Sequence, residues 1–228
     1  MTSTAANEKM FWEWIEVAWA STQDGDRLRA GIVSGEIADV DHALLPTIAA
    51  LAGVVDGLTV EGLRVFCSEF ARLMYLLDRE ELAHHIEYGD DGFMDARATI
   101  IVLGEAHYRA VTDDFRRARK CVGVEKALYI GTNAWEKRFG GTLPYPRFGF
   151  STATASNPDG WPKVRARQER DARVAAATDD VAKQLGVGRR GLRVASKDGP
   201  TVKLPNLSAE ELASVLRRVA GKLSPKGG

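Results

Sequence analysis

Apolar side chains that recur every three or four residues are the feature that most restricts how this chain folds. The pattern is clearest between Thr59 and Leu77, where it falls on Leu63, Phe66, Phe70, Leu73 and Leu77. This spacing is that of an α-helix with one buried face, and Thr59 is a typical N-cap residue. Because sustained strand-like alternation is absent from the first 146 residues, the sequence predicts an α-helical bundle there.

The same periodicity predicts further helices in this part of the chain. They span residues 11–20, 41–55, 82–86, 91–107 and 125–138, with a short charged segment over 113–120. Asp91 is expected to cap the helix that carries Phe93 and His107, and Asp78 with Glu81 to form a capping box before residue 82. Residues 21–40 contain Gly and Asp and predict a looser connection.

Charge is unevenly distributed along the chain, although the formal net charge is +0 over 228 residues. Residues 1–162 contain 16 basic and 24 acidic side chains, whereas residues 163–228 contain 15 basic and 7 acidic side chains. Such asymmetry is typical of a chain in which one part binds a charged partner. We expect an acidic α-helical domain over 1–146, a linker rich in Pro, Gly and aromatic residues over 147–162, and a basic unit over 163–228.

The basic unit is predicted to be a small α+β appendage of a mainly α protein. A charged helix is expected over 163–185, followed by a β-hairpin with strands at 192–195 and 201–204. Ser208 with Glu211 forms a capping box for a last helix with one apolar face. A hairpin and one helix have a small core, so this unit is expected to depend on the rest of the chain or on a partner for stability.

Composition excludes several classes of protein. Hydrophobic residues make up 45% and charged residues 27%, which is ordinary for globular domains and excludes collagen-like and wholly disordered chains. The first ten residues lack the apolar core of a secretory signal, and the longest apolar run, residues 43–55, is too short to span a bilayer. Cys67 and Cys121 form no C-x-x-C pair and are expected to be free core thiols. We expect a cytoplasmic protein without a membrane segment.

Several short motifs resemble those of a bacterial family catalogued as a domain of unknown function (forty-two-forty). They are Phe11-Trp12, the segment Gly89-Asp90-Asp91-Gly92-Phe93-Met94-Asp95-Ala96-Arg97, Gly104, Tyr108 and the late helix 133–140, which has Trp135 where the family has Tyr. The resemblance covers roughly residues 10–146. It implies an all-helical fold and no particular chemistry, because the family itself has no assigned activity.

The densest acidic cluster in the chain admits two interpretations. Asp90, Asp91 and Asp95 could be paired carboxylates for acid–base catalysis, with His107 as a further candidate. Alternatively, Asp91 caps a helix, Asp95 favours its positive end, and Arg64 or Arg97 pairs with them. The second interpretation is the simpler one, and it predicts that Asp95→Asn lowers the stability of the fold.

Metal and cofactor sites are not predicted. Glu81, His84 and His85 are the candidate metal ligands, and Asp39-x-x-His42 is the nearest second copy of the Glu-x-x-His spacing that di-iron bundles use. Histidines at a helix end are the alternative. The G-x-G-x-x-G motif at 186–191 follows a helix and precedes a strand, the reverse of the order in a dinucleotide site, so it is interpreted as a helix stop and a basic turn.

A stretch of basic residues in the second part of the chain is the candidate binding surface for a partner or for nucleic acid. It comprises Lys163, Arg165, Arg167, Arg170, Arg173, Arg189, Arg190 and Arg193. Phosphate binding is one interpretation, although no aromatic residues lie between the arginines to stack on bases. The alternatives are a solvated helix face that contains Glu169 and Asp171, or docking of this stretch on the acidic domain.

No signature of a known catalytic motif occurs in the chain. We therefore expect a non-catalytic interaction or regulatory protein that binds a partner protein. A hydrolase or metal-dependent enzyme that uses the Asp/His cluster is one alternative, and a nucleic-acid-binding protein that uses residues 163–193 is another. The sequence leaves the oligomeric state open.

Overall fold

The computed structural model describes residues 4–87, 89–120, 122–141, 143 and 149–184. The chain divides into two units, Met1–Pro162 and Lys163–Gly228. All regular secondary structure in the described part is helical, which confirms a mainly α fold. The β-hairpin predicted at 192–204 and the last predicted helix lie outside the described residues.

Nine α-helices and one 3-10 turn are described in the first unit. They are α1 (Ala5–Ser21), α2 (Gly25–Ser34), α3 (Val40–Asp56), α4 (Val60–Leu76), α5 (Glu80–Ile86), α6 (Asp90–Val102), α7 (Glu105–Asp113), η1 (Phe115–Arg117), α8 (Glu125–Leu128) and α9 (Ile130–Phe139). A tenth α-helix, α10 (Pro162–Gln184), follows them and forms the described part of the second unit.

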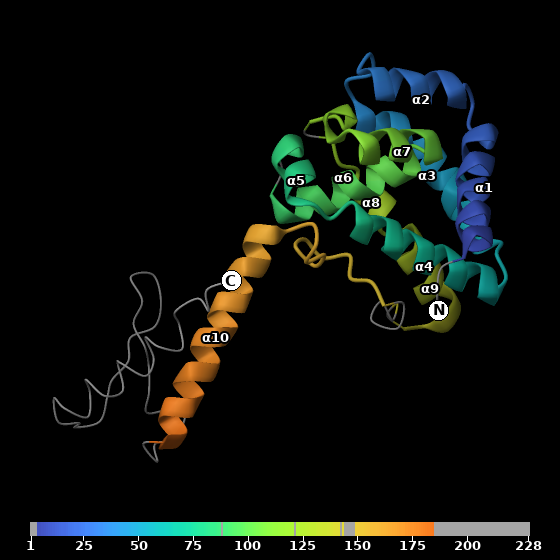
Figure 1. Ribbon diagram of the computed structural model, residues 1–228. Helices are drawn as coiled ribbons and strands as arrows, with labels where there is room; N and C mark the ends of the chain where they lie inside the picture. The colour runs from blue at the N-terminus through green and yellow to red at the C-terminus, as the bar shows by residue number, and fades with distance from the viewer. Residues whose placement is uncertain (1–3, 88, 121, 142, 144–148, 185–228) are drawn as a thin grey trace. The chain divides into compact units, whose positions relative to one another are not determined.

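Helix α6 lies among α4, α5, α7 and α8 at the centre of the first unit (Figure 1). Eight of its 13 residues are buried. A helix that is apolar on most sides is expected in this position, because neighbours cover it all round. Helix α1 packs on α3 and α4, and α9 packs on the same two helices.

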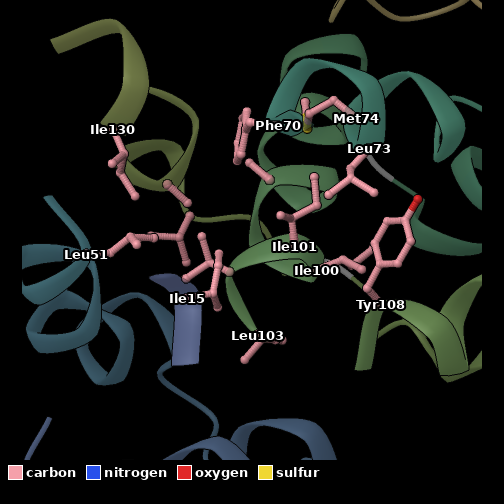
Figure 2. Close-up of a cluster of buried hydrophobic side chains, with 14 of the residues drawn as sticks. Ile15, Leu51, Phe70, Leu73, Met74, Ile100, Ile101, Leu103, Tyr108 and Ile130 are labelled. Atoms are coloured by element: carbon pink, nitrogen blue, oxygen red, sulfur yellow. The ribbon is translucent and has the colours of Figure 1, made fainter. Parts of the chain in front are cut away.

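The core forms where these helices meet. Figure 2 shows Ile15 of α1, Leu51 of α3, Leu73 of α4, Ile101 of α6 and Ile130 of α9 within one cluster of buried side chains. Ile15 and Leu73 lie on the faces that the three-and-four periodicity predicts to be buried, whereas Ile101 and Ile130 are not among the predicted core residues. The apolar area that they remove from water is the main stabilising contribution to the bundle.

Two buried core residues, Trp19 and Cys67, carry polar or ionisable atoms. The indole N–H of Trp19 donates a hydrogen bond to the carbonyl of Val102 at 2.8 Å, which satisfies an acceptor at the end of α6. Cys67 is a buried free cysteine, and burial raises the pKa of its thiol to about 12. Cys121 lies outside the described residues.

The stretch expected to be loose, residues 21–40, contains helix α2. A residue in the left-handed backbone conformation stands at each end of this helix, Asp24 at φ 54° before it and Gly35 at φ 87° after it. Only Gly25, Gly31 and Ile32 are buried along its length, so its apolar periodicity is too weak to mark a helix in the sequence.

Two segments predicted as single helices are each divided into two. The helix expected over 91–107 ends at Leu103, and Gly104, at φ 99°, turns the chain into α7. A Cβ atom at Gly104 would also lie 2.9 Å from side-chain atoms of Arg29 and Glu16. The helix expected over 125–138 is interrupted at Tyr129, between α8 and α9.

Two predicted helix caps are wrong and one is confirmed. Helix α6 begins at Asp90 with Gly89 as its N-cap, so Asp91 stands in the first turn, where it still interacts favourably with the helix dipole. Helix α5 begins after Arg79 without a side-chain cap, because the carboxylate of Asp78 binds residues elsewhere. The hydroxyl of Thr59 accepts a hydrogen bond from Gly62 N–H at 3.0 Å, as predicted for α4.

Candidate functional site

The acidic cluster lies in the first two turns of α6. Asp90 and Asp91 are exposed and Asp95 is half-buried. Burial raises the pKa of Asp95, and the carboxylates of Glu125, Asp91 and Asp41 raise it further. The tertiary structure therefore adds Glu125 of α8 and Asp41 of α3 to the predicted cluster, although no sequence spacing connects them to it.

The arginines expected to neutralise this cluster pair with other carboxylates. Arg64 lies 3.7 Å from Glu61 on its own helix, and Arg97 lies 3.8 Å from Asp78. The aspartates at the start of α6 are consequently held near one another without these two cations, which is unfavourable at neutral pH. Asp90 and Asp91 occupy the first turn of α6, where their charges interact favourably with the positive end of the helix dipole.

The candidate metal ligands do not converge. Glu81 and His84 are exposed, while His85 is half-buried with Nε2 2.8 Å from the carbonyl of Ala118. Asp39 accepts a hydrogen bond from the His42 backbone N–H at 3.1 Å, so the Asp39-x-x-His42 spacing is that of an N-cap. Within the described residues, His, Cys, Asp and Glu side chains form no group of three or more that could hold a metal ion.

His107 stands on α7 and lines a small cavity between α2, α6 and the segment after η1. The cavity has a volume of about 10 Å³, room for one water molecule, and Arg119 and Thr99 also line it. Burial lowers the pKa of His107 to about 4. His107 is therefore neutral at pH 7 and lies beside a cavity of about the size of one water molecule.

The segment predicted to be a linker contains a strap, residues 149–161, that is fastened to the bundle by Asp78. Both carboxylate oxygens of Asp78 are fully buried. They accept hydrogen bonds from the backbone N–H groups of Ala155 at 3.0 Å, Ser156 at 2.7 Å and Asn157 at 2.9 Å, from the Ser156 hydroxyl at 3.1 Å and from the Trp161 indole at 2.8 Å. Five donors on one carboxylate make a strong, charge-assisted anchor.

Arg97 holds the same strap from the side of α6. Its guanidinium is completely buried and donates to the carbonyls of Met74 at 2.9 Å and Thr152 at 2.8 Å. It also lies over the ring of Phe93, 4.6 Å from the centroid, and Phe93 meets Trp161 edge to face. Burial lowers the pKa of Arg97 to about 10 against the opposing effect of Asp78. Phe93 and Arg97 of the resemblance motif thus serve the architecture of the domain.

A second network of charges ties α1 to α4 and α7. Arg72 donates to Glu69 at 2.7 Å and to Glu8 at 2.8 Å, and Arg109 also pairs with Glu8. Burial raises the pKa of Glu8, but Arg72 and Arg109 outweigh this effect and the pKa is lowered. Glu69 is only 1% exposed. The ion pair with Arg72 compensates the burial of this carboxylate, because an unpaired carboxylate at this depth is very unfavourable.

The structure describes some of the basic residues predicted to bind a partner. Arg165, Arg167, Arg170 and Arg173 lie on α10 and are exposed. Arg189, Arg190 and Arg193 lie outside the described residues. On α10, Arg165 pairs with Glu169 at 2.9 Å, and Arg167 and Arg170 approach Asp171 at 3.8 and 3.6 Å.

An open groove of about 450 Å³ runs between α3 and α8–α9. Ile48 and Ala52 of α3 line it on one side, and Ile130 and Ala134 of α9 line it on the other. The half-exposed ring of Tyr129 stands at its rim, 42% exposed. This groove could not be predicted from local spacing, because each helix alone shows only an ordinary apolar face.

No family model, no curated protein and no solved structure matches the chain. The resemblance over residues 10–146 therefore remains a prediction. In the described part of the chain, every helix is too short or too polar to cross a lipid bilayer.

Proposed function

We propose that this protein is a non-catalytic, cytoplasmic interaction protein that binds a partner protein, with α10 as the principal contact. The observation that carries the proposal is the surface of α10. All residues from Arg165 to Arg173 are exposed in this helix of 23 residues. Residues 165–173 contain no large apolar side chain, so this part of the helix gains little from packing on its own domain and is better explained by what it presents to solvent.

The arrangement of charges on α10 favours an acidic protein partner over nucleic acid. At 3.6 residues per turn, the four arginines of residues 165–173 are spread over more than half of the helix circumference. Glu169 and Asp171 lie among them and pair with Arg165 and Arg167. A phosphate backbone favours a continuous basic stripe, whereas a protein surface with both signs of charge can match an alternating pattern.

The buried charges of the first unit support a binding role in a different way. Asp78, Arg97 and Glu69 are fully buried, and each is used to hold one segment of the fold on another. Asp95, a remaining candidate for acid–base chemistry, is influenced by the carboxylates of Glu125, Asp91 and Asp41. Together these observations favour a stable scaffold that carries a charged helix.

The test compares the full chain with a variant in which Arg165, Arg167, Arg170 and Arg173 are all replaced by Glu. Affinity capture from nuclease-treated cell extract, followed by mass spectrometry, identifies proteins retained by the first and lost from the second. A captured protein is then purified and its Kd measured by titration calorimetry at several salt concentrations. We expect the charge-reversed variant to bind at least about tenfold more weakly, because several exposed pairs are changed from attraction to repulsion.

A chain without residues 163–228 serves as the second comparison. Proteins that bind this shortened chain as well as the full chain use the helical domain, which would contradict a principal role for α10. Retention that disappears on nuclease treatment, together with a steep salt dependence of binding to a DNA or RNA duplex, would instead support the nucleic-acid alternative.

A further inference from the structure

The groove between α3 and α8–α9 has an apolar floor. Ile48 is 7% exposed, Ile130 4% and Ala134 6%, and Ala52 lies beside them half-buried. These side chains form the bottom of an opening between α3 and α9, which pack on each other. Grooves with an apolar floor commonly bind the apolar face of an amphipathic helix.

A row of polar side chains that can donate hydrogen bonds borders this floor along α8–α9. Lys126, Tyr129 and Asn133 follow one another at intervals of three and four residues, and all three are exposed. Among the described residues, no ionic or side-chain hydrogen-bond partner is found for any of the three. At the other end of the groove, Lys137 pairs with Asp56, so that end carries little net charge.

On the α3 side the groove is lined by Ile48, Ala52 and Asp56, and the small side chain of Ala52 lets another backbone approach closely. Ala49 and Gly53 are exposed on the turn next to Ala52. A Cβ atom at Gly53 would meet nothing within 4 Å, so no internal contact requires glycine there. Glycine in the middle of a helix costs about 1 kcal/mol relative to alanine, and packing within the domain does not offset this cost.

We propose that this groove binds an acidic amphipathic helix of a partner protein. Aliphatic side chains of the helix fill the floor over Ala52 and Ala134, and its carboxylates accept from Lys126, Tyr129 and Asn133. Lys126 selects an acidic segment, because a basic one would bring like charges together there, while Tyr129 and Asn133 donate hydrogen bonds to its carboxylates. This inference rests on the proposed partner-binding function but uses a surface different from α10.

The test uses two synthetic helical peptides with identical Leu and Ala positions, one with Glu and one with Lys at the flanking polar positions. Binding is measured by fluorescence anisotropy with the full chain in which Arg165, Arg167, Arg170 and Arg173 are replaced by Gln. This background prevents capture of the Glu peptide by α10, so failure here and failure of the proposed function are separate results. We expect saturable binding of the Glu peptide and at least about fivefold weaker binding of the Lys peptide.

Variants then locate the binding. Lys126→Glu and Asn133→Glu change exposed side chains, and each is expected to weaken the Glu peptide at least about fivefold and to strengthen the Lys peptide. Lys9→Glu, the same charge change at an exposed site outside the groove, is the matched control and should leave both affinities unchanged. Absence of saturable binding, or equal effects of Lys126→Glu and Lys9→Glu, would overturn the proposal.

Discussion

At the residue scale, the most consequential side chain is Asp78, which no motif in the sequence singled out for this role. A fully buried carboxylate is tolerated because five donors surround it and Arg97 lies beside it. Removal of one member of such a group leaves the others buried without a partner. The cost of the substitution therefore exceeds the value of any single hydrogen bond.

We predict that Asp78→Ala lowers the free energy of unfolding by about 3–5 kcal/mol, because the buried Arg97 loses its counter-ion and three backbone N–H groups lose their acceptor. Urea denaturation followed by circular dichroism measures the change. Asp91→Asn, which alters an exposed carboxylate one turn before Asp95, is the control and should change stability by less than about 1 kcal/mol. A similar effect of the two substitutions would contradict the anchoring role of Asp78.

Asp95 is predicted to oppose folding at neutral pH, which reverses the expectation drawn from the sequence. Its pKa is raised by burial and by Glu125, Asp91 and Asp41, so the ionised form is disfavoured in the folded state. A raised folded pKa means that stability is greater below that pKa and is lost as the pH rises through it. Asp95→Asn should increase the free energy of unfolding at pH 7 by about 0.5 kcal/mol, and the gain should disappear at pH 3. A loss of stability at pH 7 would restore the original interpretation.

His107 is expected to make the fold sensitive to mild acid. The folded-state pKa of about 4 is below the ordinary 6.5, so the unfolded chain binds more protons between these values. Stability should therefore fall as the pH drops through this window, by up to about 2 kcal/mol at pH 5. Urea denaturation at pH 7 and pH 5 measures the fall, and His107→Gln should reduce it. An unchanged pH dependence in that variant would assign the effect to other groups.

At the element scale, the strap shows how a segment without regular secondary structure becomes part of a helical domain. Its composition predicts a linker rich in Pro, Gly and aromatic residues. In the structure Phe150 contacts Tyr75, and Gly160 N–H and carbonyl groups bond to Asn157 and Glu80. Hydrogen bonds between residues about 80 positions apart cannot be inferred from local spacing, because only the folded bundle brings them together.

Gly160 offers a test of how closely the strap must approach. A Cβ atom there would lie 2.1 Å from the carbonyl oxygen of Asp78, so alanine forces the strap away from the bundle. Gly160→Ala should lower the urea midpoint and expose Phe150 and Trp161 to chymotrypsin. Gly141→Ala, where a Cβ atom meets nothing within 4 Å, is the matched control and should leave both measurements nearly unchanged. Equal behaviour of the two variants would show that the strap is not held at this point.

At the scale of the whole molecule, the net charge of +0 conceals an acidic part and a basic part of equal magnitude. Molecules of this kind can attract one another through unlike parts when salt is low, and a net charge near zero removes the repulsion that would keep them apart. The attraction should decline as salt shortens the screening length from about 30 Å at 0.01 M to about 8 Å at 0.15 M.

Static light scattering checks this expectation. The second virial coefficient should be negative at about 0.01 M salt and should rise toward zero or above at about 0.15 M. Replacement of Arg165, Arg167, Arg170 and Arg173 by Gln removes four positive charges and should raise the low-salt value. A coefficient that does not depend on salt would show that the two parts do not interact between molecules.

The sequence by itself determined the helical class and the core. Leu63, Phe66 and Leu73 repeat at intervals set by the helix turn, and burial of such a face follows from local spacing alone. The tertiary structure decided what the polar residues do. Asp78 and Arg97 bind the strap through hydrogen bonds. Asp95 lies near the carboxylates of Asp41 on α3 and Glu125 on α8. The groove is lined by Lys126, Tyr129 and Asn133 on one side and by α3 on the other. The physical reason is range: apolar periodicity is encoded within one helix, whereas a hydrogen bond or a charge pair depends on which distant segment packs against it.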